Sequence, residues 1–494
     1  MNADTMIDEQ VKQHDKFTAE IKVSFGARKR LKLNDFAFNI WLFVPNSLDI
    51  NRFNYSKQDF YKDMRSNIRL MTPVYLLRNI VWAENSPFVY LEKAFKKITQ
   101  QPTRTNSEEY EYQIKMFLSI LKSSLRDEVN HIKSAKNEDI DYLVTNYIKN
   151  VKAIIQKYRD LYPLINVPNI DSKLMDFYRY GEEFMCNVTE KYTFLLLRGL
   201  KSEHITHFDK FKKTILELID ELTEVKKLKG YPNVENEQKN ISSDFVYRLG
   251  LLKKYAESHL YLNVKKRRDG VLVEQFLYSL AAGISMVFAT VIAFSVQRQF
   301  GNFTMPLFVA LVVSYMLKDR IKELSRYYFA HKMGSRYFDH KIAMNINDTD
   351  IGWAKESMDF IQDSKVPAEI IKLRDRSSII DAIYKTDKEK IILYRMHMHI
   401  DRERLNSTSP YFFSGVNSII RFNTANFLRN MDNPDFPLHL ANEKDGFEII
   451  KGKKLYYLNL IIQKQNETQN ELRHYRLVLN RDGILRIESE PELK

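Results

Sequence analysis

The sequence lacks the patterns on which several classes of protein depend. Its 494 residues include one cysteine, Cys186, which excludes an intramolecular disulfide framework and a cysteine-rich zinc module. Glycine is scarce, with 14 residues, and neither common nucleotide-binding fingerprint, GxGxxG or GxxxxGKS/T, occurs. The first 16 residues contain four acidic side chains and no apolar run, so we expect neither a secretory signal nor a mitochondrial presequence. The absence of a recognisable catalytic motif favours a non-enzymatic role.

The residues that are present predict folded domains and a membrane segment. Hydrophobic residues make up 44% of the chain and aromatic residues 13%, which is enough apolar surface for packed cores. The mean hydropathy of −0.41 makes any long apolar run conspicuous. One region, residues 271–317, stands out in this way and is the strongest functional signal in the sequence.

This region contains two uncharged runs that are separated by Arg298. The first covers 23 residues, 275–297, and the second covers 19 residues, 299–317. About 20 helical residues cross the ~30 Å hydrocarbon core of a bilayer. We therefore predict a two-helix transmembrane hairpin with spans at about 275–297 and 301–317. The alternatives are one span with a buried or re-entrant helix, because the second run begins with polar residues, or a pair of core helices.

Basic residues flank this hairpin on both sides. The net charge is +3 over residues 265–269 and +3 over residues 318–332, whereas Arg298 is the one charge between the two runs. Positive charge beside a span marks the cytoplasmic side, so we expect both termini in the cytoplasm and anionic headgroups as a partner. The flanking basic residues that we assign to this role are Lys265, Lys266, Arg267, Arg268, Lys318, Arg320 and Lys322.

The position of these charges bears on localisation and on other partners. Nearly half of the formal charge of +13 lies beside the hairpin, which weighs against nucleic acid as the partner of a basic chain. Binding of nucleic acid through other basic surface, such as the cluster Arg28, Lys29, Arg30 and Lys32, remains a second alternative. The composition favours a bacterial inner membrane over a eukaryotic membrane.

A ridge of small residues runs along the first predicted span. Small side chains let helix backbones approach closely in lipid. The ridge predicts either packing against the second span, which has its own small residues, or self-association of the protein through the hairpin. The ridge residues are Ala281, Ser285, Ala289 and Ala293, and those of the second span are Ala310 and Ser314.

Outside the hairpin, hydrophobic periodicity predicts a fold that is mainly α with a smaller β part. Apolar residues recur every three or four positions in the first half of the chain, and short β-branched and aromatic runs dominate the end. The predicted regions are an N-terminal β-hairpin region at 1–55, a cytoplasmic helical bundle at 56–264, the transmembrane hairpin at 271–317, a juxtamembrane helical connector at 318–364 and a cytoplasmic antiparallel β-domain at 365–494.

Several finer expectations concern how these regions join. Residues 17–25 and 34–44 are expected to form the strands of the N-terminal hairpin and to complete the C-terminal β-domain. The last helix of the bundle, about 242–264, is expected to run straight into the membrane. A short helix is expected near 353–362.

One strand segment carries a candidate metal site. His397, His399 and Asp401 alternate along a predicted strand and therefore share one face. Imidazole and carboxylate groups are zinc ligands, and the spacing resembles the first part of the metallo-β-lactamase signature H-x-H-x-D-H. Arg402 stands where the last histidine of that signature belongs, so the motif is incomplete.

The sequence thus favours a two-span membrane-anchored protein with cytoplasmic N- and C-terminal domains. We expect it to act as a scaffold, a sensor or a membrane effector through contacts with other proteins. The alternative is a membrane-tethered, metal-dependent hydrolase that uses His397, His399 and Asp401, with zinc as the metal. No other cofactor is indicated.

Overall fold

The protein folds into two units, and in the sequence the segments of unit 2 interrupt those of unit 1. Unit 1 contains Met1–Ile68, Asn263–Pro410 and Gly415–Lys494, and unit 2 contains Arg69–Leu262 and Tyr411–Ser414. The computed structural model describes residues 7–27, 31–168, 171–233, 242–301, 304–334, 337–346, 349–374, 389–442, 446–466 and 470–489.

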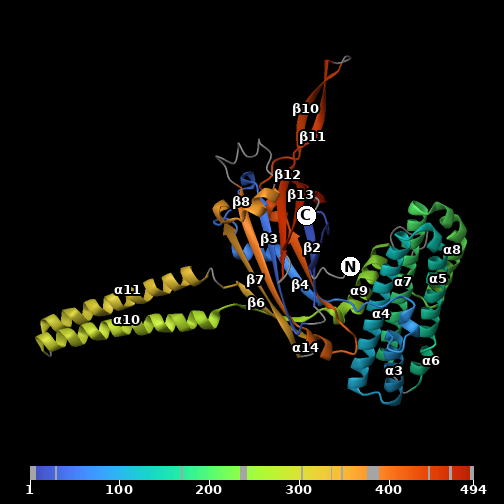
Figure 1. Ribbon diagram of the computed structural model, residues 1–494, viewed down its shortest axis with the longest axis horizontal. Coiled ribbons are helices and arrows are strands. Elements are labelled where there is room, and N and C mark those ends of the chain that lie inside the picture. Colours follow the sequence, from blue (N-terminus) through green and yellow to red (C-terminus); the bar gives the residue numbers. More distant parts are fainter. Residues whose placement is uncertain are drawn as a thin grey trace. The chain divides into compact units, whose positions relative to one another are not determined.

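Unit 1 is built on two antiparallel sheets that pack face to face (Figure 1). The smaller sheet has the order β1 (Ile7–Gln13), β2 (Thr18–Gly26), β9 (Gly415–Asn423) and β4 (Met64–Leu70). The larger sheet has the order β14 (Gly483–Ser489), β13 (Asn470–Asn480), β12 (Tyr456–Gln465), β3 (Leu33–Val44), β8 (Lys390–Asp401), β7 (Thr349–Ile361), β6 (His340–Ile346) and β5 (Asn263–Arg268).

Aromatic side chains fill the space between the sheets. Phe25 of β2 packs against Phe36 and Phe38 of β3, with ring centroids 5.5 and 6.5 Å apart. β2 and β3 therefore belong to opposite sheets, and our expectation that they pair with each other was wrong. The N-terminal hairpin consists of β1 and β2 instead. Both β2 and β3 do pair with C-terminal strands, namely β9 and β12.

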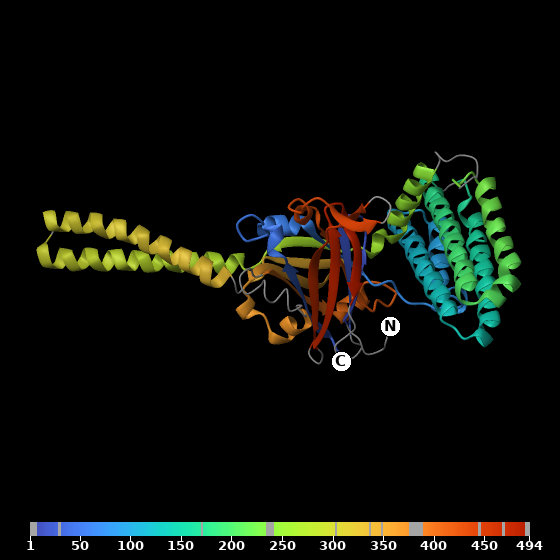
Figure 2. The same ribbon diagram turned by 90° about the horizontal axis from the view of Figure 1, so that it is seen from above.

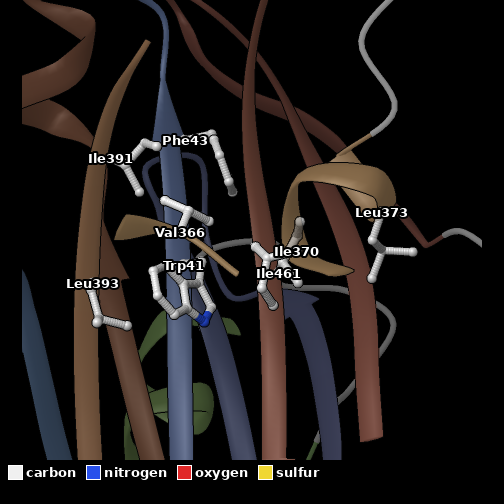
Figure 3. Packing of buried hydrophobic residues seen from close by; sticks show 8 residues of the cluster. All are labelled: Trp41, Phe43, Val366, Ile370, Leu373, Ile391, Leu393 and Ile461. Carbon is white, nitrogen blue, oxygen red and sulfur yellow. The ribbon is translucent and has the colours of Figure 1, made fainter. Parts of the chain in front are cut away.

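One end of the outer face of the larger sheet carries its own small core. Helix α12 (Ala368–Arg374) lies over this face and seals a cluster around Trp41 (Figure 3). Burial of such a cluster supplies roughly 25 cal/mol per Å² of apolar surface. The cluster consists of Trp41, Phe43, Val366, Ile370, Leu373, Ile391, Leu393 and Ile461.

Two long helices of unit 1 connect β5 and β6, which are neighbouring strands of the larger sheet. Helix α10 (Val271–Phe300) follows β5, and helix α11 (Met305–Gly334) precedes β6. The two helices lie side by side along their length (Figure 2). We expected the last helix of the bundle to run straight into α10. This expectation was wrong, because the basic segment 263–268 forms the edge strand β5. Residues 349–361 likewise form strand β7 rather than the expected short helix.

The composition of these helices supports one of the two predicted membrane spans and does not confirm the second. Within the described residues, one helix, α10, is long and apolar enough to cross a membrane, judged by length and composition alone. Little of this helix is buried. Helix α11 does not qualify, because only 13 residues separate its start at Met305 from the charge of Lys318. Thirteen residues span about 20 Å, which is shorter than the ~30 Å hydrocarbon core.

Unit 2 is an α-helical bundle with an aromatic centre, in agreement with the bundle that the periodicity predicts. Tyr158 and Tyr178 stack with ring centroids 5.0 Å apart, and Phe95 packs edge-on against both. Its main helices are α3 (Pro87–Gln100), α4 (Arg104–Lys133), α5 (Asn137–Arg159), α7 (Ser172–Glu203), α8 (Ile205–Leu228) and α9 (Ser242–Glu257).

A two-stranded ribbon in unit 1 stands apart from both sheets. Strands β10 (Asp435–Asn442) and β11 (Gly446–Lys453) pair only with each other among the described strands, and Figure 1 shows them projecting from the sandwich. The sequence did not indicate this ribbon. Its apolar side chains are exposed, namely Phe436, Leu438, Leu440, Phe447, Ile449 and Ile450.

Candidate membrane-anchoring site

The base of the helical hairpin is held by a pair of strands. β5 and β6 are antiparallel neighbours, with Arg268 opposite His340 at the end where α10 begins. Gly270 makes the turn into α10 with φ of 72°, and a Cβ at this position would lie 2.9 Å from the ring of Tyr337. Helix α10 therefore begins, and helix α11 leads back, at the same edge of the larger sheet.

A buried carboxylate, Glu356 of β7, ties this edge to the rest of the sheet. Lys266 Nζ lies 2.5 Å from Glu356 Oε1 and His340 Nδ1 lies 3.4 Å from it, while the hydroxyl of Tyr394 donates a hydrogen bond of 2.9 Å to Oε2. Burial would raise the pKa of Glu356, but the hydrogen bond from His340 and the charge and hydrogen bond of Lys266 outweigh it and lower the pKa. The carboxylate is therefore ionised at neutral pH and joins β5, β6, β7 and β8.

A second carboxylate, Asp339, makes a similar junction just before β6. It accepts hydrogen bonds from Lys57 Nζ at 2.7 Å and from the hydroxyl of Tyr61 at 2.9 Å, both on helix α1 (Lys57–Asp63). It also accepts the backbone N–H of Met358 at 2.8 Å. Burial, together with the nearby negative charge of Asp339, raises the pKa of Tyr61. Helix α1 is thus fastened to the root of the hairpin.

A cavity of about 610 Å³ opens between α1, β5 and the first turns of α10. Its wall carries both signs of charge, and its cations already have partners: Arg268 lies 2.9 Å from Glu274, and Lys57 bridges Asp339 and Asp359. The cavity therefore presents balanced charge rather than an open anion site.

The small-residue ridge of α10 faces α11. Ala281, Ser285 and Ser314 are buried although most of both helices is exposed. Ser314 Oγ donates a hydrogen bond of 3.2 Å to the backbone carbonyl of Ala289. Ala293 and Ala310 are partly buried. The structure thus uses the ridge for packing within the hairpin.

The basic flanking residues lie on two different elements. Lys265, Lys266, Arg267 and Arg268 are on the exposed edge strand β5. Arg320 is exposed on α11, and Lys318 and Lys322 are partly exposed there.

The residues proposed for a metal site do not come together as ligands. His399 Nδ1 lies 2.8 Å from Asp35 Oδ1 and its ring stacks on Trp353, while His397 Nε2 is 3.7 Å from the same carboxylate oxygen. Burial lowers the pKa of His397, so its ring is neutral at pH 7.

Asp401 serves a separate, structural role. It accepts the backbone N–H of Arg404 and caps helix α14 (Arg402–Ser407). Across the described part of the chain, no group of three or more His, Cys, Asp or Glu side chains is placed to hold a metal ion.

The basic cluster near residue 30 is only partly described. Arg28, Lys29 and Arg30 lie outside the described residues, and Lys32 forms an ion pair of 2.6 Å with Glu403.

Sequence reasoning missed the side chains that hold the hairpin in place. Glu356, Asp339 and Tyr61 come from segments nearly 300 residues apart, and no local pattern marks them. The paired strands β5 and β6 were missed because β5 is a charged segment with one apolar residue, Val264. Comparison of the chain with protein-family models, curated proteins and solved structures found no match.

Proposed function

We propose that this protein is anchored in a membrane by the α10/α11 hairpin and holds both of its units on one side of the bilayer. It acts there as a scaffold, sensor or effector through contacts with other proteins. Two observations together carry the proposal. Helix α10 is apolar and exposed, and the strands on either side of the hairpin, β5 and β6, are paired with each other.

This strand pair has a topological consequence for membrane insertion. Since β5 and β6 are hydrogen-bonded neighbours, the chain that leaves through α10 returns through α11 to the same place. Insertion of α10 without α11 would separate β6 from β5 and break the hydrogen bonds between them. The two helices therefore enter the bilayer together, and the sandwich stays on the side from which they enter.

Charge identifies that side. The basic residues of β5 and of the second half of α11 lie at the base of the hairpin, and Arg298 lies near its tip. Cytoplasmic segments are richer in Lys and Arg, and the cytoplasmic leaflet carries the anionic lipids. Both units then face the cytoplasm, in a bacterium beneath the inner membrane.

The ribbon of β10 and β11 favours a role in protein contacts over a catalytic one. A lone two-stranded ribbon is marginally stable in water, and exposed apolar patches mark interaction sites. Phe436, Leu438 and Ile450 lie on one face of the ribbon, since Leu438 pairs with Ile450 and Phe436 lies two residues away. This surface is the best candidate in unit 1 for a protein partner.

Membrane fractionation of the full chain tests the anchor. We expect the protein in the pellet after alkaline carbonate washing and in the detergent extract. The double variant Phe294→Arg/Val309→Arg places two charges on exposed sites near the hairpin's tip and should move most of the protein to the soluble fraction. The matched control, Leu228→Arg/Val246→Arg, adds the same charges to exposed apolar sites of unit 2 and should stay in the pellet. Recovery of the unaltered chain in the carbonate supernatant would refute the anchor.

A further inference from the structure

The register between α10 and α11 determines which parts of the hairpin are apolar on both helices. Ser314 lies opposite Ala289, as their hydrogen bond shows, and the guanidinium of Arg326 lies 4.6 Å from the ring centroid of Tyr278. Counting four residues from the first pair places Lys318 level with Ser285. The charged half of α11 thus lies beside the first half of α10.

The same count fixes the other boundary at the tip. Arg298 is nine residues beyond Ala289, and Met305 is nine residues before Ser314, so these two residues share a level. The segment in which neither helix carries a charge is therefore limited to residues 286–297 of α10 and 305–317 of α11. Its length, from the level of Arg298 to that of Lys318, is about 20 Å.

Insertion energies decide against embedding the remaining apolar part of α10. A Leu, Ile or Phe at the centre of a membrane helix contributes about −0.3 to −0.6 kcal/mol, whereas an Asp, Lys or Arg costs about 2.5–3.5 kcal/mol. Sinking Phe276, Leu280 and Ile284 would also sink a charged segment of α11. One such charge offsets the gain from about five apolar side chains. The charged residues at this level are Lys318, Asp319, Arg320, Lys322, Glu323 and Arg326.

We infer that the hydrocarbon core of the bilayer covers only the outer part of the hairpin, residues 286–297 of α10 and 305–317 of α11, and that residues 271–285 and 318–334 form a helical stalk outside the hydrocarbon. Both helices cross in the outer half. The 20 Å segment falls short of the ~30 Å core by about 5 Å at each end. The long side chains of Arg298 and Lys318 bridge this difference by extending to the headgroups on opposite sides.

This inference rests on the proposed anchor and adds a depth to it. The length of the uncharged run in α10 and the depth to which α10 inserts are therefore different quantities. Helix α10 has the longer uncharged run, but the helix with the shorter run, α11, sets the level of the membrane. A cavity beside Glu274 and Tyr278 then lies above the lipid surface rather than in it.

Cysteine labelling of the full chain in membrane vesicles tests the depth. The single native cysteine, Cys186, is buried in unit 2, and Cys186→Ala supplies the background. Single cysteines are then introduced at Phe276, Leu280 and Leu324 for the stalk, and at Val291, Phe294 and Val312 for the embedded half, all of which are exposed. Inside-out vesicles are treated with a membrane-impermeant maleimide, which reacts with a thiolate in water and not with a thiol in hydrocarbon.

We expect the stalk cysteines to react at least tenfold faster than the embedded ones, and all six to react once detergent is added. Protection of the cysteines at 276 and 280 to the same degree as that at 294 would overturn the inferred depth while leaving the anchor in place. Rapid labelling at 291, 294 and 312 without detergent would show that the hairpin is not inserted, which refutes the anchor itself.

Discussion

Helices α10 and α11 are both 30 residues long and pack against each other, yet they differ in how they distribute charge. α10 is uncharged from Gln275 to Gln297, whereas α11 turns charged at Lys318, 13 residues after its start. Taken alone, α10 reads as a complete membrane span and α11 as half of one. Because they are joined and in register, neither description holds for the pair. In the proposed anchor, the more polar helix limits how deeply the more apolar helix inserts into the bilayer.

The largest effect should come from placing one charge at two levels of α10. Val291→Arg puts a charge into the segment that is apolar on both helices and should cost about 2.5–3.5 kcal/mol of insertion free energy, roughly a hundredfold in partitioning. Leu280→Arg adds the same side chain to the stalk and should leave insertion nearly unchanged. The membrane-bound fraction in a translation and insertion assay measures both. Equal losses for the two variants would contradict the difference between the halves of α10.

A smaller effect is expected at the boundary that α11 sets. Lys318 reaches the near headgroups with a long side chain, which an aspartate cannot do. Lys318→Asp should reduce the ratio of membrane-bound to unbound protein about tenfold, since the charge lies at the edge of the hydrocarbon and costs about 1–2 kcal/mol there. Lys322→Asp makes the same change about 6 Å further from the bilayer and serves as the control. A stronger defect in Lys322→Asp than in Lys318→Asp would place the boundary elsewhere.

The smallest effect concerns the pair of strands, β5 and β6, between which the helical hairpin is inserted. The pKa of Glu356 in the folded protein is below its ordinary value of 4.5, so its ionised form stabilises the fold above that pH. This contribution is lost as the pH falls through the lowered pKa. Glu356→Gln should therefore lower the unfolding temperature of detergent-solubilised protein by about 1–2 °C at pH 7, corresponding to about 1 kcal/mol. The difference from the unaltered protein should shrink as the pH falls below 4.5, and a difference that grows there would be inconsistent with the ion pair.

Sequence periodicity predicted the elements whose apolar faces repeat locally. Helices α4 and α5 lie in the predicted bundle region 56–264, and strands β8, β9, β12, β13 and β14 lie in the predicted β-domain region 365–494, because each element buries a regular set of side chains. Strands β5 and β7 were missed for a physical reason. β5 is an exposed edge with four consecutive basic residues, and the buried and partly buried residues of β7 do not alternate regularly along the strand.

The candidate site was predictable in its composition and not in its geometry. The uncharged run from Gln275 to Gln297 predicts a membrane helix from the sequence alone. The depth of that helix depends on the Ser314–Ala289 contact, which exists only once the hairpin has closed. His397 and His399 show the opposite case. Their spacing on one face of a strand suggests a metal site, but the two rings instead contact Asp35 and Trp353 on neighbouring strands.

The pairing of β5 with β6 makes the anchor an interruption of what would otherwise be a simple β-hairpin. Arg268 and His340 are already partners across the ladder, so a short turn could join them in place of the helices between. Deletion of that stretch from a gene would leave the sheets with all their strands. The proposed membrane anchor is in this sense an accessory of the sandwich, since neither sheet takes a strand from the two helices.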